Sequence, residues 1–378
     1  MAKSPVTRPH EPFNTVVADR RRGRGAAQNT SGRFESEQRV TQDRTWNYAD
    51  CGWPEPTGDD EPPPLATTVT VDATRTILAR NNSPDLGFEQ SINPYRGCEH
   101  GCIYCFARPS HEYLGFSAGL DFETKILAKP EAAELLRAEL SKRSYRCRVI
   151  AMGTNTDPYQ PVERKLGITR SILEVLSECG HPVGIVTKSH LVTRDIDILA
   201  GMAERNLVRV NLSVTTLDRA LARRMEPRAA TPPKRIEAIR LLAEAGIPTG
   251  VMVAPVIPGL NDAEIEAILE AAYAAGARSA AKTLVRLPFG VKDLFQAWLA
   301  EHAPGRADRV MSLIRQSRDG RDNDPQFFSR MTGSGPYAAM LDQRFKAACR
   351  RIGFNQHRAE LDHSQFRAPG ESRQLAFL

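Results

Sequence analysis

The sequence contains no apolar run of the length needed to cross a bilayer, so a membrane-spanning protein is not expected. The opening segment lacks the apolar core and small-residue cleavage site of a secretory signal, which predicts a cytoplasmic location. No G-x-G-x-x-G motif follows any strand-like segment, and this disfavours a dinucleotide-binding fold.

Cysteine is also scarce, with seven in 378 residues, and a reducing compartment disfavours a disulfide framework. Four of the seven have no neighbour at metal-ligand spacing and are interpreted as buried, inert thiols: Cys51, Cys147, Cys179 and Cys349. The other three are close together in sequence, at Cys98, Cys102 and Cys105. This concentration is the strongest chemical signal in the chain.

The composition, 41% hydrophobic and 25% charged, is that of a globular protein, and the length could hold one α/β barrel with extensions. The net charge of +6 and the pI near 9.0 suit an acidic partner such as nucleic acid. Many proteins that bind no nucleic acid share this charge, so it decides little alone.

Three regions are expected along the chain. Residues 1–75 are interpreted as a largely irregular arm with a basic run, RRRGRG, and an acidic stretch, TGDDEPPP. The basic run either forms a solvated tail, the slightly favoured interpretation, or binds phosphates. Residues 76–288 are expected to form a partial barrel, and residues 289–378 a helical C-terminal extension that caps it and ends in an exposed tail.

Short β-branched or apolar segments alternate with amphipathic helical patterns through the middle region, which predicts a parallel sheet. The expected strands are residues 88–93, 147–153, 182–188, 207–216, 247–257 and 280–288. Six strand–helix units predict an α/β fold of the partial (βα)6 TIM-like barrel type. In such folds the chemistry takes place at the carboxyl ends of the strands, and the cysteines would directly follow the first strand.

Three thiolates on one short loop have two interpretations. They could bind zinc with His100 as fourth ligand, although zinc sites usually pair two well-separated hairpins of ligands. They could instead bind three corners of a [4Fe-4S] cluster and leave the fourth iron without a protein ligand. The cluster interpretation is the better match to three cysteines on a single loop. The iron without a protein ligand would then be a catalytic site.

The pattern Cys98-x3-Cys102-x2-Cys105, with Tyr104 before the last cysteine, resembles the signature of the radical S-adenosylmethionine (SAM) superfamily. This resemblance implies a [4Fe-4S] cluster and SAM as cofactors, with reductive cleavage of SAM to a 5′-deoxyadenosyl radical. Residues 87–290 and the arm segment RRGRGAAQNTSGRFE are similar to the subgroup of spore photoproduct lyase and its uncharacterised bacterial relatives.

Polar residues at successive strand ends fit a bound SAM molecule. Gly153 allows a close backbone approach, and Thr154 and Asn155 after it offer polar groups to an ammonium. Lys188 can pair with a carboxylate, and Ser213 carries a hydroxyl where an apolar side chain would be expected. The resemblance implies that Lys188 and Ser213 contact the SAM carboxylate and that Thr154 and Asn155 contact its amino end. Tyr104 and Gly153 complete the expected cofactor contacts.

The substrate is not apparent from any single residue. The resemblance favours DNA repair of a lyase-like kind, but the lyase has a hydrogen-donating cysteine where this chain has Gly153, so thymine-dimer reversal by that route is not expected. The tail Gln374–Leu378 resembles the peptides by which repair proteins bind the replication sliding clamp. A reductase or flavodoxin-type electron donor is also expected.

Two alternatives stay open. The first is a radical SAM enzyme that modifies a protein, an RNA or a metabolite. The second is a non-catalytic nucleic-acid-binding module stabilised by a Cys3His zinc site or by a cluster.

Overall fold

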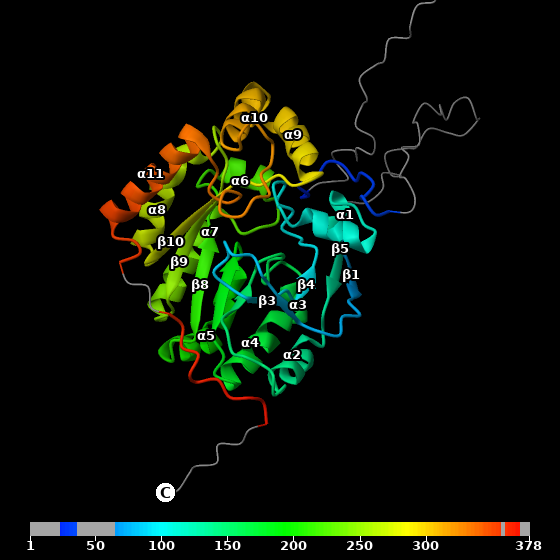
Figure 1. Cartoon of the computed structure of the whole chain (residues 1–378), viewed down its shortest axis with the longest axis vertical. Helices are drawn as coiled ribbons and strands as arrows, with labels where there is room; N and C mark the ends of the chain where they lie inside the picture. Colours follow the sequence, from blue (N-terminus) through cyan, green and yellow to red (C-terminus); the bar gives the residue numbers. More distant parts are fainter. Residues whose placement is uncertain (1–22, 36–64, 357–359, 371–378) are drawn as a thin grey trace, which may run out of the picture.

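The computed structural model describes residues 23–35, 65–356 and 360–370 (Figure 1). They form a mixed α/β fold in which helices flank a central, largely parallel sheet. The expected clamp-binding tail, Gln374–Leu378, lies outside the described residues, as does Cys51. No helix in the described part of the chain is long and apolar enough to span a membrane.

The central sheet has seven strands in the order β10-β9-β8-β7-β6-β3-β2. Their bounds are β2 Leu78–Arg80, β3 Gln90–Ile92, β6 Ile150–Met152, β7 Val183–Thr187, β8 Val208–Ser213, β9 Thr249–Val256 and β10 Ser279–Leu284. From β3 to β10 every neighbouring pair is parallel, whereas β2 joins β3 antiparallel. Five of the six parallel strands lie wholly within segments predicted from the sequence, and β10 begins one residue before its predicted segment, at Ser279.

Helices cover this sheet and bury its apolar strands. Their bounds are α2 Ala132–Leu140, α3 Glu163–Leu166, α4 Ile168–Glu178, α5 Ile196–Glu204, α6 Arg219–Met225, α7 Pro232–Glu244 and α8 Ile265–Ala274. Short 3-10 helices lie at η4 Arg108–Leu114, η5 His190–Asp195, η6 Asp262–Glu264 and η7 Pro304–Arg306. Each long helix presents one apolar stripe to the sheet, as Ile172 and Leu176 of α4 show by being fully buried.

A second, three-stranded sheet was not predicted. β1 (Thr68–Val71) pairs parallel with β5 (Lys125–Ala128), and β5 pairs antiparallel with β4 (Tyr95–Arg96). The short helix α1 (Leu120–Thr124) leads directly into β5. The end of the expected irregular arm is therefore a strand.

The C-terminal region contains three α-helices in its described part: α9 (Val291–His302), α10 (Ala307–Gln316) and α11 (Gly335–Ile352). α11 lies beside α8, where Arg344 forms an ion pair of 2.6 Å with Glu266, so it extends the outer helical layer (Figure 1). The expectation that the whole extension caps the domain therefore needs correction for α11. Only α9 and α10 lie over the end of the sheet where the cysteine loop is found.

Two large apolar cores form in the described part of the chain, beside a small cluster of Cys98, Ala107 and Phe122. The larger lies between the central sheet and its helices. The smaller packs Cys102, Ile103 and Tyr104 against buried residues of α9 and α10, including Phe295 and Trp298. The cysteine loop is thus covered on one side by helices that come much later in the chain.

Candidate active site

The three cysteines lie on a loop that follows β3 and β4, at the carboxyl end of the central sheet. Cys98 and Cys102 are buried and Cys105 is partly exposed. Gly97 and Gly101 adopt φ values of +78° and +65°, which side chains rarely tolerate, and these conformations turn the loop back on itself. The loop is therefore built to bring three thiols into one small space.

Burial raises the pKa of all three thiols, most strongly by desolvation. The charges of Asp157 and of Cys102 add to this effect at Cys98. At Cys105 the Arg108 guanidinium opposes it, as do hydrogen bonds from the backbone amides of Ala107 and Arg108. Thiols whose pKa is raised in this way stay protonated unless a positively charged metal centre binds them as thiolates.

The two expected metal centres place their cysteine ligands differently. Ligands around one zinc ion lie about 4 Å apart, since Zn–S bonds are about 2.3 Å. Among residues 23–35, 65–356 and 360–370, no three His, Cys, Asp or Glu side chains converge closely enough to bind one metal ion. A [4Fe-4S] cluster spreads three cysteine ligands over three irons, which suits a wider arrangement.

A buried arginine supports the back of the cysteine loop. Arg108 has no exposed surface, and its guanidinium donates hydrogen bonds to the carbonyl oxygens of Cys102 at 3.0 Å and Gly101 at 3.3 Å. The same group forms an ion pair of 2.5 Å with Glu123, which is also fully buried. Because Arg108 bonds to the loop backbone itself, it fixes the loop that carries the thiols.

A segment from the N-terminal region completes this support. We call residues 23–35 the N-terminal strap. Gly25 and Ala26 of the strap donate their backbone amides to the two carboxylate oxygens of Glu123, at 2.9 and 2.8 Å. A side chain on Gly25 would lie 1.8 Å from the carbonyl oxygen of Gly101, so only glycine allows this contact.

The strap corrects the expectation for the RRRGRG run at Arg24, while the first three arginines of the run lie outside the described residues. Arg24 is buried, and its guanidinium donates to the carbonyl oxygens of Glu123 and Leu65, both at 2.8 Å. Asn29 and Asp121 exchange two hydrogen bonds further along the strap. Arg24 is therefore neither a solvated tail residue nor free to bind phosphate.

The predicted SAM contacts after β6 lie at the end of that strand. Gly153 has φ of +87°, and a side chain there would lie 2.0 Å from the carbonyl oxygen of Val186. Asn93, at the end of β3, accepts hydrogen bonds from the Asn155 amide at 3.1 Å and from the Thr154 hydroxyl at 3.4 Å. Thr154 and Asn155 are thus held beside the first strand, on the same end of the sheet as the cysteine loop.

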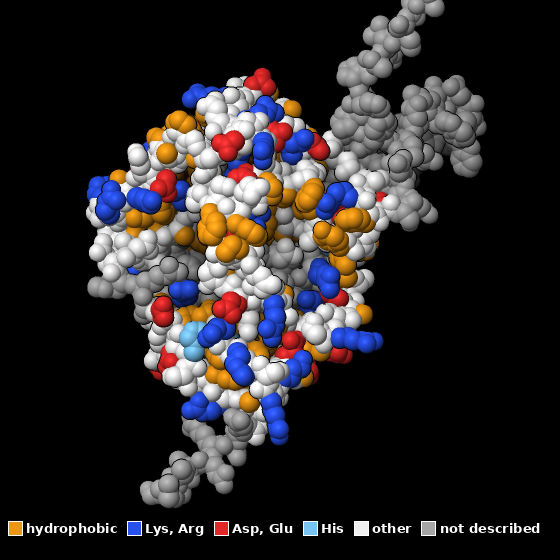
Figure 2. All heavy atoms as spheres, in the orientation of Figure 1, with side chains coloured by type: hydrophobic (Ala, Val, Ile, Leu, Met, Phe, Trp, Pro, Cys, Tyr) orange, Lys and Arg blue, Asp and Glu red, His pale blue; other side chains and the backbone are white. Residues whose placement is uncertain are grey.

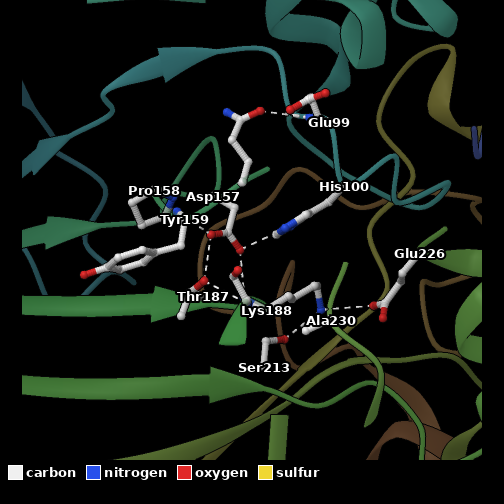
Figure 3. A network of polar contacts seen from close by, with 12 residues as sticks. Glu99, His100, Asp157, Pro158, Tyr159, Thr187, Lys188, Ser213, Glu226 and Ala230 are labelled. Atoms are coloured by element: carbon white, nitrogen blue, oxygen red, sulfur yellow. Dashed lines mark hydrogen bonds and ion pairs between the residues drawn. The ribbon is translucent and has the colours of Figure 1, made fainter. Parts of the chain in front are cut away.

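Lys188, after β7, forms the centre of a polar network (Figure 3). Its ammonium donates to the Ser213 hydroxyl at 2.8 Å and to the Thr215 hydroxyl at 3.0 Å, and it lies 3.2 Å from a carboxylate oxygen of Glu226. Burial and the nearby positive charge of Arg235 lower the pKa of Lys188 to about 7. Lys188 and Ser213 therefore meet, as the sequence predicted.

Glu226 was not predicted, although it connects most of this network. Its carboxylate accepts hydrogen bonds from the Thr215 hydroxyl at 2.6 Å and from the Tyr104 hydroxyl, and it pairs with buried Arg235. The ring of Tyr104 lies 5.6 Å from the Lys188 ammonium. The residue before Cys105 is thereby joined to the strand ends that carry Lys188 and Ser213.

Asp157 ties the cysteine loop to β7 (Figure 3). It accepts hydrogen bonds from the Lys188 amide at 2.8 Å and the Thr187 hydroxyl at 2.7 Å, and it lies 3.3 Å from Nδ1 of His100. Burial raises the pKa of Asp157, but His100 and these hydrogen bonds outweigh burial and lower it overall. His100, the expected fourth ligand of a zinc site, therefore has one ring nitrogen engaged with Asp157.

The residues that connect one helix, strand or loop of the site to another were not predicted from the sequence. Asn93, Arg108, Glu123, Glu226 and Arg235 all position site residues, yet none belongs to a recognisable spacing pattern. Of these, only Asn93 ends a predicted strand, and this position could have identified it. The others lie in or beside helices, where a charged residue is usually solvated.

Comparisons with known proteins agree with this geometry. A family model described as "Radical SAM superfamily" matches residues 92–272. The uncharacterized protein Rv2578c of Mycobacterium tuberculosis (strain H37Rv) is 38% identical over 237 residues, which is 62% of this chain and 70% of that protein. The uncharacterized protein MJ0683 of Methanocaldococcus jannaschii is 29% identical over 178 residues, covering 47% of this chain and 64% of the relative.

A solved structure of a spore photoproduct lyase variant has a similar fold. Its TM-score is 0.52 at 16% sequence identity, and the match covers 76% of this chain and 80% of that chain. At this level of identity the likeness concerns the fold alone.

Proposed function

Because the chain belongs to the radical SAM superfamily, we propose that it reductively cleaves SAM at a [4Fe-4S] cluster held by Cys98, Cys102 and Cys105. The observation that carries this proposal is the placement of three buried thiols on one loop, beside the Lys188 network. The cofactors of the family are a [4Fe-4S] cluster and SAM, and when bound they supply a 5′-deoxyadenosyl radical.

The chain's own charges favour an anionic ligand at the Lys188 network. Arg235 is cationic and Glu226 is the carboxylate between it and Lys188, so the three groups together carry one excess positive charge when Lys188 is protonated. A carboxylate of SAM would balance this charge and accept hydrogen bonds from Lys188 and Ser213. Glu226 acts as a positioning residue, because it holds Lys188 and Tyr104 toward the same space.

The other end of SAM is assigned to the neighbouring strands. Asn93 orients the backbone of Asn155 and the hydroxyl of Thr154, which present polar atoms beside the cysteine loop. The left-handed turn at Gly153 brings this backbone against β7 and leaves no room for a side chain. These groups would bind the SAM ammonium, and the tight turn would fix their orientation.

For the substrate, we propose nucleic acid, with damaged or modified DNA as the first candidate. The net charge of +6 and the lyase-like fold support this choice. By its resemblance to the lyase, this chain has Gly153 where the lyase has its hydrogen-donating cysteine. We therefore propose that the substrate radical reacts in a different way. The expected partners are a flavodoxin-type electron donor and, through Gln374–Leu378, the sliding clamp.

The decisive experiment is anaerobic reconstitution with iron and sulfide, followed by chromatography for 5′-deoxyadenosine. We expect Cys102→Ala to lose cluster absorbance and SAM cleavage, because two thiolates retain a cluster poorly. Cys349→Ala is the matched control, since Cys349 is a buried thiol on α11 outside the cysteine loop, and it should behave as the parent protein. Protein that stays iron-free, or that holds one zinc ion, would contradict the proposal and favour the zinc module.

A second assay addresses the substrate. Lesion-bearing DNA, RNA, protein extracts and metabolite pools would each be incubated with the reconstituted protein, and products analysed by mass spectrometry. Consumption of DNA alone supports the proposed substrate class. Modification of another class of molecule, with DNA unchanged, would make that class the substrate in place of DNA. The result that the protein cleaves SAM would still stand.

A further inference from the structure

The exposed aromatic side chains of this protein gather around the cysteine loop. Six of the nine large hydrophobic side chains that are exposed in the described part of the chain are aromatic. We call these six the aromatic rim: Phe34, Phe106, Tyr113, Phe289, Phe327 and Phe328. They come from four segments that are far apart in sequence. Figure 2 shows hydrophobic side chains gathered across the middle of one face, below α9 and α10 of Figure 1.

One half of the rim is a set of stacked rings around an arginine. Phe34 and Tyr113 stack with their ring centroids 5.0 Å apart. The Arg33 guanidinium lies 3.7 Å from the centre of the Phe289 ring and 5.2 Å from that of Phe34. Tyr113 is 71% exposed and Phe289 is 61% exposed, so flat ring surfaces remain open to a ligand.

The other half of the rim borders the cysteine loop directly. Phe106 follows Cys105 in the chain, and the Arg286 guanidinium lies 5.0 Å from the centre of its ring. Arg330 lies 4.8 Å from the ring of Phe327. Arg286 and Phe289 belong to the same short segment after β10, which joins the two halves.

Arg286 differs from the other two arginines because it lacks an anionic partner. Arg33 pairs with Glu112 at 2.5 Å, and Arg330 pairs with Asp85 at 2.5 Å. Arg286 has no ion pair with any residue that the structure describes, and its buried Nε has no hydrogen-bond partner there. Asp85 and Asp324 attract this guanidinium from a distance, but its burial and the positive charge of Arg330 outweigh them and lower its pKa. A partly buried guanidinium with an unbonded N–H is costly, and an anionic ligand that bonds to it directly would reduce that cost.

We propose that the aromatic rim and Arg286 bind unpaired nucleotides of a single-stranded nucleic acid. Bases would stack on the exposed rings, and Arg286 would pair with a phosphate. Ring faces of this kind reach only bases that are not stacked within a duplex, which selects single strands or extruded bases. The inference rests on the proposed function in one respect. A base bound at the rim would lie on the Cys105 side of the loop, and the proposed function places the cluster on this loop.

The test measures fluorescence anisotropy of a labelled 12-nucleotide DNA strand with the full-length, reconstituted protein under anaerobic conditions. The rim variants are Phe289→Ala and Arg286→Gln, and the matched controls are Leu166→Ala and Arg143→Gln, which change exposed residues outside the rim. We expect each rim variant to weaken binding by about fivefold or more, and the controls to bind as the parent protein. Arg286→Gln should also reduce the slope of log affinity against log salt by about 0.7.

Two further arms define the ligand. An RNA strand and a DNA duplex of the same sequence distinguish the two kinds of single strand from double-stranded DNA, and a 2-aminopurine base in the strand reports stacking by its quenched fluorescence. Quenching that is lost in Phe289→Ala supports the rim as a stacking surface. If that variant melts early, Tyr113→Ala provides the same measurement at a more exposed ring.

Several results would overturn the inference: no binding of single strands by the intact protein, equal binding by the rim variants, or preference for the duplex. Tight binding of a peptide in place of the oligonucleotide would overturn it as well. Failure here is separable from failure of the proposed function. Protein that produces 5′-deoxyadenosine yet binds no strand contradicts only the rim, whereas rim-dependent binding without SAM cleavage contradicts only the proposed reaction.

Discussion

The two sides of the cysteine loop are built in opposite ways. The back of the loop is buried: Arg108 donates hydrogen bonds to two of its carbonyl oxygens, and Glu123 joins Arg108 to the N-terminal strap. The front of the loop opens onto the aromatic rim, where rings are exposed and the Nε of Arg286 has no hydrogen-bond partner among the described residues. Polar groups that are satisfied internally hold a structure in place, while unsatisfied ones are free for a ligand. The comparison thus separates the residues that hold the site from those that would bind a substrate.

The largest expected effect is at the back of the loop, from Glu123→Gln. The change removes the carboxylate that pairs with fully buried Arg108, and uncompensated buried charge costs about 3–5 kcal/mol in the free energy of unfolding. Denaturant titration of the variant measures this loss. Glu178→Gln breaks the exposed pair with Arg137 and is the control, with an expected loss below about 1 kcal/mol. Equal losses in the two variants would remove the distinction between the two sides of the loop.

Acid should weaken the back of the loop next. His111 is buried, its Nε2 donates to the Lys125 carbonyl oxygen at 2.9 Å, and its Nδ1 has no partner among the described residues. Burial lowers the pKa of His111 to about 4 from an ordinary 6.5. Between these values the unfolded chain binds a proton that the folded chain does not, so the free energy of unfolding falls as the pH falls, by about 3 kcal/mol in total.

The variant His111→Gln isolates this contribution. Its free energy of unfolding should vary less with pH between 4 and 6.5 than that of the parent protein. His181, whose pKa burial also lowers to about 4, contributes equally to both proteins and cancels in the comparison. Parallel pH profiles would show that His111 titrates normally.

The smallest of the three effects is expected for Gly25→Ala. The new methyl group would lie 1.8 Å from the Gly101 carbonyl oxygen, and such overpacking costs about 1–3 kcal/mol. Displacement of the strap should also speed the loss of iron to a chelator. Gly290→Ala, on the segment that carries the rim, is the control because nothing lies within 4 Å of its added methyl group. A strap variant that retains iron as long as this control would separate the strap from the cluster site.

Much of the central sheet could be predicted because its strands are continuous β-branched runs between helical patterns. The segment 182–188 contains β7, and 207–216 contains β8. The three-stranded sheet could not be predicted in the same way. β1 and β5 are four residues each, and Thr68 pairs with Lys125 across a long separation in sequence, so no local pattern connects them.

The site residues divide in the same way into those that a sequence pattern points to and those that it does not. Cysteine spacing drew attention to the loop, and position at or just after the end of a strand drew attention to Ser213 and Lys188, whose SAM contacts the family resemblance implies. Glu226 lies at the end of α6, where the sequence gives no reason to expect a buried carboxylate. The strap has no apolar periodicity, since it is held by backbone amides and by one buried arginine, and neither feature leaves a pattern in the sequence.

The N-terminal strap also bears on where the functional unit of this protein begins. The family match starts at residue 92, well after the strap, and ends at residue 272, before α9 and α10. A fragment cut at those borders would keep all three cysteines but lose the strap on one side of their loop and helices α9 and α10 on the other. Water would then reach the Glu123 carboxylate from one side and Tyr104 from the other. The smallest piece able to protect an oxygen-sensitive centre therefore extends from the strap to the end of α10.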